Sequence, residues 1–126
     1  MPRGLALALV LVAATACGGP RSSLGTPASL CYRALPAAAA TVHHKGRFVG
    51  VRRMKSSAVV RYLPQAAGAA DLCVVAYSDH FKPGDVEGVH FEHPARYAIV
   101  AVTARTLKPA GAFVTNRLPF RFQRRV

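Results

Sequence analysis

Two short apolar runs in the second half of the chain are its clearest secondary-structure signals. Residues 72–77 read LCVVAY and residues 97–103 read YAIVAVT, both rich in valine and shorter than typical helices. Such continuous apolar runs are typical of strands buried on both faces. The stretch between them, 78–96, contains glycines and prolines and is predicted to be a long loop. We therefore expect a sheet with these two runs as central strands.

Weaker strand signals flank this pair. Residues 46–54 contain β-formers after a glycine, and 112–115 can return as a paired strand after the turn-forming sequence KPAG. Residues 118–122 alternate between apolar residues and proline or polar residues, which predicts an edge strand. Residues 58–63 fit either a hairpin partner or a short helix, and the sequence leaves both open.

One helical face precedes the strands. Four apolar residues of the segment 28–44 recur at helical spacings: Cys31, Leu35, Ala38 and Val42. Pro36 interrupts this pattern, so we expect either a kink or two short helices, the second beginning near Pro36. Together these elements predict an α+β fold, with one helical layer packed on a small, mostly antiparallel sheet of four to five strands.

The amino-terminal segment has the layout of an export signal. Arg3 is followed by an uncharged apolar run from Leu5 to about Ala14, and small residues then precede Cys17. Ten to twelve helical residues span about 15–18 Å, which is short against roughly 30 Å of hydrocarbon in a bilayer. Residues 1–16 are therefore predicted to be a signal peptide.

The sequence Ala14-Thr15-Ala16-Cys17, followed by two glycines, resembles the lipobox of bacterial lipoproteins. In that family the leader is cut before the cysteine, whose sulfur receives a diacylglycerol. The resemblance covers residues 1–17 and implies a lipid anchor at Cys17 on the extracytoplasmic face of the cell membrane. The pattern Ala14-x-Ala16 also fits an ordinary signal-peptidase site, which would release a secreted protein instead.

The rest of the chain is predicted to form a tether and one domain. Residues 17–28 are rich in glycine, proline and serine without apolar periodicity, as in a flexible tether. Residues 29–126 then form a single small α+β domain, which gains much from a covalent staple because small domains bury less surface. If Cys17 carries lipid, Cys31 and Cys73 remain, and we expect a disulfide between them. Two buried free cysteines are the alternative.

The chain is strongly basic. It has 17 Lys and Arg against 5 Asp and Glu, and all the acids lie within residues 71–92. Its 52% hydrophobic content argues against a disordered basic tail. We expect attraction to an anionic lipid or wall polymer through these residues: Arg47, Arg52, Arg53, Lys55, Arg61, Arg121, Arg124 and Arg125. Solubility and codon usage are the alternative explanation. Export argues against nucleic acid as a partner, and no nucleic-acid-binding motif is present in the sequence.

The segment 78–96 also contains candidate chemistry. Imidazole and carboxylate groups suit Zn²⁺ or Cu²⁺, and the residues that offer them are His80, His90, Glu92 and His93. A solvated loop with histidines beside acids is the simpler alternative. Ser78, Asp79 and His80 are the residue types of a catalytic triad, but consecutive residues cannot form the relay.

The sequence thus predicts an exported, lipid-anchored envelope protein with a non-catalytic binding role. We expect no enzymatic activity and no cofactor, and the sequence identifies no protein partner. The alternatives are a metal-binding envelope lipoprotein that uses the His80–His93 loop, and a small secreted hydrolase.

Overall fold

The computed structural model of the chain describes residues 27–122. The predicted signal peptide, Cys17, Arg124 and Arg125 therefore lie outside the described residues. With η denoting a 3₁₀ helix, the elements in chain order are η2 (Pro27–Ala34), α1 (Leu35–Thr41), β1 (Arg47–Lys55), α2 (Ser56–Val59), η3 (Pro64–Ala66), β2 (Asp71–Phe81), β3 (Ala95–Thr103) and β4 (Pro109–Thr115). Within the described range, no helix is long and apolar enough to cross a membrane.

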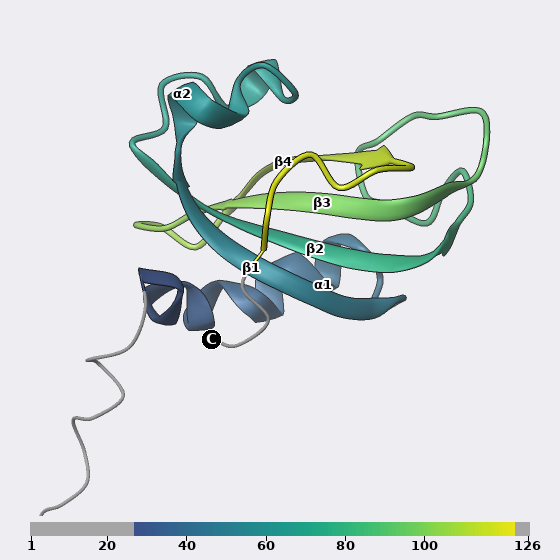
Figure 1. Cartoon of the computed structure of the whole chain (residues 1–126), viewed down its shortest axis with the longest axis horizontal. Helices are drawn as coiled ribbons and strands as arrows, with labels where there is room; N and C mark the ends of the chain where they lie inside the picture. The colour runs from purple at the N-terminus through teal and green to yellow at the C-terminus, as the bar shows by residue number, and fades with distance from the viewer. Residues whose placement is uncertain (1–26, 123–126) are drawn as a thin grey trace, which may run out of the picture.

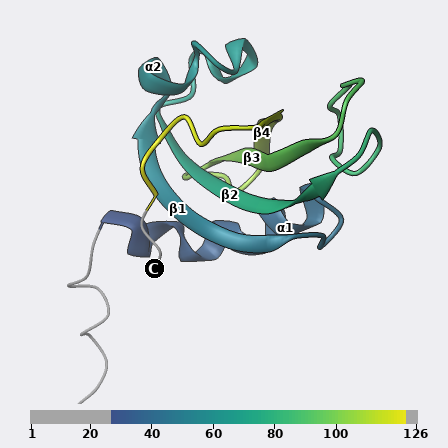
Figure 2. The same cartoon turned by 45° about the vertical axis from the view of Figure 1, so that its right-hand side comes forward.

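The strands form one open, antiparallel sheet of four strands in the order β1-β2-β3-β4. The sheet is strongly curved, with η2 and α1 along one face and the short helix α2 above the other (Figures 1 and 2). The antiparallel sheet is confirmed, and so are the two central strands, since the predicted runs 72–77 and 97–103 lie in β2 and β3. The ambiguous segment 58–63 begins within α2 and forms no hairpin strand.

The helical part is smaller than a full layer. A 3₁₀ stretch is followed at Leu35 by a seven-residue α-helix, with Pro36 in its first turn. This confirms the expectation of two short helices rather than one kinked helix. Because a 3₁₀ helix has three residues per turn, Cys31 and Ala34 lie on one side of η2, and both are fully buried against the sheet. Leu35, expected on the buried face, is only partly buried.

Two other expectations about the strands are wrong. β2 does not end near Tyr77 but continues to Phe81, with a register shift against β3 between Ser78 and Phe81. Residues 118–122 form no strand, although their alternation is real. Phe120 and Phe122 instead pack against the sheet face under α2, where apolar burial takes the place of strand pairing.

Both faces of the sheet are buried, which explains the continuous apolar runs. On the face that carries η2 and α1, Val75 and Val100 belong to a core that includes Phe81. On the face under α2, Val74 and Ile99 belong to a second core. The second core ends in an aromatic cluster, where the Tyr62 ring is stacked 5.7 Å from that of Phe113 and lies edge-on to Phe120 at 5.2 Å.

The predicted disulfide between Cys31 and Cys73 is present and joins η2 to β2. The two Cα atoms are 5.4 Å apart, within the range in which a disulfide closes without backbone movement. Both cysteines are fully buried, so the bond lies inside the core between the helical segment and the sheet. It fixes η2, which has few residues of its own to bury, onto the central strand β2.

Candidate functional site: the two ends of the sheet

The antiparallel register collects distant parts of the chain at two ends of the sheet. At one end, Lys55 is paired with Asp71, and the neighbouring Leu72 is paired with Thr103. We call this the entry end, because the described chain begins beside it with η2, at the left of Figure 1. The opposite end carries the β2–β3 connection, residues 82–94, and we call it the loop end.

The entry end contains a surface hollow of about 590 Å³. Residues of η2, of three strands and of two connections line it: Leu30, Arg53, Gly68, Ala70, Asp71, Thr103, Ala104, Arg105 and Thr106. The Arg53 guanidinium donates a hydrogen bond of 2.8 Å to the Asp71 carboxylate, so the one acid of the hollow is already paired. Arg105 is exposed at its rim and forms no ion pair within residues 30–122.

Two large apolar side chains of η2 are exposed, and one of them, Leu30, lines this hollow. Leu30 and Tyr32 are 61% and 66% exposed, more than the other large hydrophobic residues that the structure describes. Arg33 is also exposed, and the three-residue period of η2 places it on the same side as Leu30. The entry end is therefore both apolar and basic.

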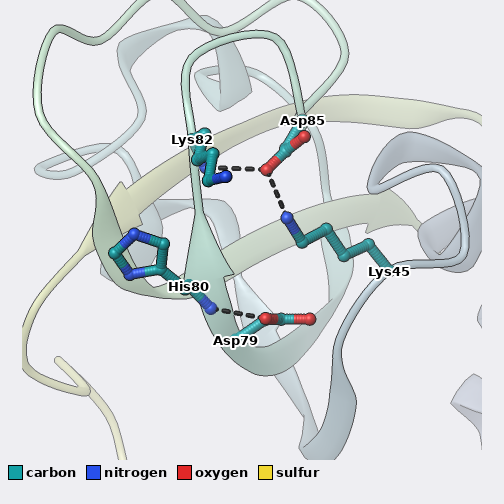
Figure 3. Close-up of polar contacts among 5 residues, drawn as sticks. All are labelled: Lys45, Asp79, His80, Lys82 and Asp85. Atoms are coloured by element: carbon teal, nitrogen blue, oxygen red, sulfur yellow. Dashed lines mark hydrogen bonds and ion pairs between the residues drawn. The ribbon is translucent and has the colours of Figure 1, made fainter.

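At the loop end, the acidic residues hold the β2–β3 connection against the end of α1. Figure 3 shows the Asp85 carboxylate accepting hydrogen bonds from Lys45 Nζ and from the Lys82 backbone N–H, each at 2.7 Å. The Glu87 backbone N–H donates to the Thr41 carbonyl at 2.8 Å, and Val86 is buried in the core. Val86 and these contacts anchor the connection, whereas most of its other residues, including His90, Glu92 and His93, are exposed, as expected for a solvated loop.

The pKa of Asp85 is perturbed by the two hydrogen bonds that its carboxylate accepts. The hydrogen bond from Lys45, together with that from the Lys82 N–H, lowers the pKa of the Asp85 carboxyl below its ordinary value of 3.8. Because the folded-state pKa is depressed, the carboxylate stabilises the fold at pH values above the ordinary pKa. That contribution is lost as the pH falls through the folded-state pKa.

We therefore expect Asp85→Asn to reduce the loss of stability on acidification. Wild type and variant are compared by denaturant unfolding at neutral pH and below pH 3.8, the ordinary value for Asp85. The wild-type midpoint should fall further than that of the variant. Asp79→Asn serves as the control, since in the described chain the Asp79 carboxylate accepts only the adjacent His80 N–H, at 2.6 Å. Equal acid sensitivity of wild type and Asp85→Asn would contradict the assignment.

The candidate metal ligands are not brought together. His80 lies at the end of β2, and its ring is turned away from the Asp79 carboxylate in Figure 3. His90 and Glu92 line a separate hollow of about 270 Å³, and His93 is exposed further along the connection. Among the described residues, no three His, Cys, Asp or Glu side chains are grouped so that they could hold a metal ion.

The basic residues selected from the sequence are divided between the faces and ends of the sheet. In β1, Arg52 is paired in register with Val74 and Arg53 with Cys73, and these two partners belong to different cores. Successive strand residues point to opposite faces, so these two arginines do as well. Four of the selected residues lie on β1, with Arg47 toward the loop end and Lys55 toward the entry end.

The remaining described members of that set contact aromatic rings or backbone. The Arg61 guanidinium lies 5.8 Å from the centre of the Tyr62 ring. Arg52 Nη1 donates to the Arg121 carbonyl at 3.4 Å, which ties the C-terminal segment to the edge strand β1. These contacts give part of the predicted basic set a structural role.

Sequence reasoning missed the residues that make the entry end distinctive. Leu30 and Arg33 lie three residues apart on one side of η2, and the apolar helical face expected from the sequence includes neither of them. Arg105 was passed over because it lies in the turn between β3 and β4, remote in sequence from the basic residues selected above. The signal that could have found it is strand register, which brings that turn beside the start of β2.

Comparisons with protein-family models, curated proteins and solved structures find no significant match to this chain, so its function is argued from its own residues.

Proposed function

We propose that the protein is exported, anchored to the cell membrane by a lipid on Cys17, and acts on the extracytoplasmic face as a non-catalytic binding domain. The observation that carries this proposal is the buried Cys31–Cys73 disulfide. Disulfides persist in oxidising compartments outside the cytosol, which agrees with an export signal. The bond also uses two of the three cysteines and leaves Cys17, at the end of the leader, as the odd one.

The charge distribution supports a binding role at an anionic surface. Of the five acids, Asp71 is bonded to Arg53, Asp85 to Lys45, and Glu87 lies 3.5 Å from the His43 ring. The remaining lysines and arginines of residues 30–122 form no ion pairs within that range, so the domain presents a net positive surface. Anionic lipid or an anionic wall polymer are the partners that this chemistry fits. Among the described residues, the ungrouped histidines give no support to the metal-binding alternative.

The lipid anchor is tested with Cys17→Ala in the full chain. We expect wild type in the membrane fraction and Cys17→Ala in the soluble extracytoplasmic fraction, because the Ala14-x-Ala16 pattern remains available to an ordinary signal peptidase. Mass spectrometry of the wild-type amino terminus should show a diacylglycerol-modified Cys17. Ala14→Leu, which gives the commonest form of the lipobox, is the matched control and should stay with the membrane. An unmodified Met1, or three free thiols in wild type, would refute the proposal.

A further inference from the structure

We propose that the entry end is the surface on which the domain rests against an anionic bilayer, with a headgroup phosphate received in the hollow beside Leu30. This inference deepens the proposed function and rests on its lipid anchor. It differs from the basic set selected from the sequence, because it assigns binding to one end of the sheet and includes apolar residues.

The first argument is where the chain enters the domain. η2 begins at Pro27, so residues 17–26 are all that separates a lipidated Cys17 from the entry end. A flexible linker of that length has a root-mean-square span of about 16–19 Å, and it reaches about 35 Å when fully extended. The entry end is therefore the part of the domain held nearest to the bilayer.

The second argument is the kind of side chain exposed there. Leu30 and Tyr32 are largely exposed on η2, and both are more exposed than the other large hydrophobic residues that the structure describes. Leucine inserts readily at the boundary between headgroups and acyl chains, and tyrosine is enriched there because one end of its ring is polar. The neighbouring Arg33 is suited to headgroup phosphates through its planar set of donors.

The third argument is the chemistry of the hollow. Arg105 contributes a guanidinium, and Thr103 and Thr106 contribute hydroxyl groups, all of which can donate to a phosphate oxygen. Arg53 uses one amino group to bind Asp71, and its guanidinium has further donors. The volume of about 590 Å³ is in the range of small-ligand sites. The hollow therefore offers donors for one phosphate group.

The fourth argument is that acidic side chains are distributed unequally between the two ends of the sheet. Asp71 is the acid at the entry end, where it is paired with Arg53. The other four acids lie on or near the β2–β3 connection at the loop end: Asp79, Asp85, Glu87 and Glu92. Of these, Asp85 is paired with Lys45, and Glu87 lies 3.5 Å from the His43 ring. An anionic surface attracts the first end and repels these carboxylates at the other. Electrostatics and the position of the tether thus favour the same orientation.

The test is binding of the released Cys17→Ala chain to vesicles of mixed phosphatidylglycerol and phosphatidylcholine. Because this chain carries no lipid, the result does not depend on whether Cys17 is modified, and the membrane-fractionation experiment tests that separately. We expect binding at low salt that weakens toward physiological salt. Adding Arg33→Glu and Arg105→Glu should weaken the binding at least ten-fold, since each charge near the surface changes affinity about five-fold.

The matched control reverses two exposed arginines at the loop end, with Arg96→Glu and Arg117→Glu, and changes the net charge equally. We expect less than a three-fold effect, because these residues face away from the bilayer. Leu30→Ser with Tyr32→Ser should weaken binding at both low and physiological salt. If the two charge-reversed variants lose vesicle affinity to the same extent, the proposed orientation is wrong. If the chain does not bind vesicles, or binds only a soluble glycerol phosphate polymer, the bilayer is not the partner.

Discussion

Removing the Cys31–Cys73 disulfide is expected to destabilise the folded domain by about 4 kcal/mol. The two residues are 42 apart in sequence, and a cross-link that closes a loop of this length removes much conformational freedom from the unfolded chain. The bond also fixes η2, a short 3₁₀ segment, against β2. A domain of this size is stable by only a few kcal/mol to about 10 kcal/mol, so the expected loss is a large fraction of the total.

The measurement is thermal unfolding of Cys31→Ala/Cys73→Ala and of wild type with and without reductant. Alanine suits this test because both cysteines are fully buried, where a serine hydroxyl would lack a partner. A loss of about 4 kcal/mol corresponds to a fall in Tm of about 15–30 °C for a domain of this length. Cys17→Ala, which leaves the disulfide intact, is the control and should unfold at the wild-type temperature. An unchanged Tm in reductant would show that the bond contributes little.

The disulfide could be predicted because the chain has three cysteines, and a lipid on Cys17 leaves a single possible pair. No such count predicts which surface residues lie close together. The central strands could also be predicted, because a sheet covered on both faces buries adjacent residues such as Val74 and Val75 and so has continuous apolar runs. The entry end could not be predicted. It depends on strand register, which is set by tertiary packing rather than by local pattern.

In the C-terminal segment, the alternation seen in the sequence is real, but the strand predicted from it is absent from residues 118–122. Phe120 and Phe122 alternate as in a strand, and the alternation does reflect burial. Their partners are aromatic rings, since Phe120 lies edge-on to Tyr62 at 5.2 Å and to Phe122 at 6.1 Å. Pro119 lacks an N–H for a ladder, so burial is satisfied here without strand pairing.

Phe81→Ala is expected to cost about 3–5 kcal/mol, the range for deleting a fully buried aromatic side chain. Phe81 follows three polar residues in the sequence, which is why β2 was expected to end earlier, yet its side chain is fully buried. The space for its ring depends on Gly46, where an added Cβ atom would lie 2.9 Å from Phe81 Cζ. Gly46 also has φ +95°, a conformation that residues with side chains rarely adopt.

This variant is measured by chemical denaturation, with Phe48→Ala as the matched control. Phe48 lies near the same end of the sheet on β1 but is 37% exposed, so its truncation should cost about 1 kcal/mol. Phe81 belongs to the same core as Val42 and Val86, one after the end of α1 and the other in the β2–β3 connection. Its loss should therefore also raise amide hydrogen exchange at Glu87, whose N–H is bonded to Thr41. If Phe81→Ala costs no more than Phe48→Ala, Phe81 does not hold the connection against α1.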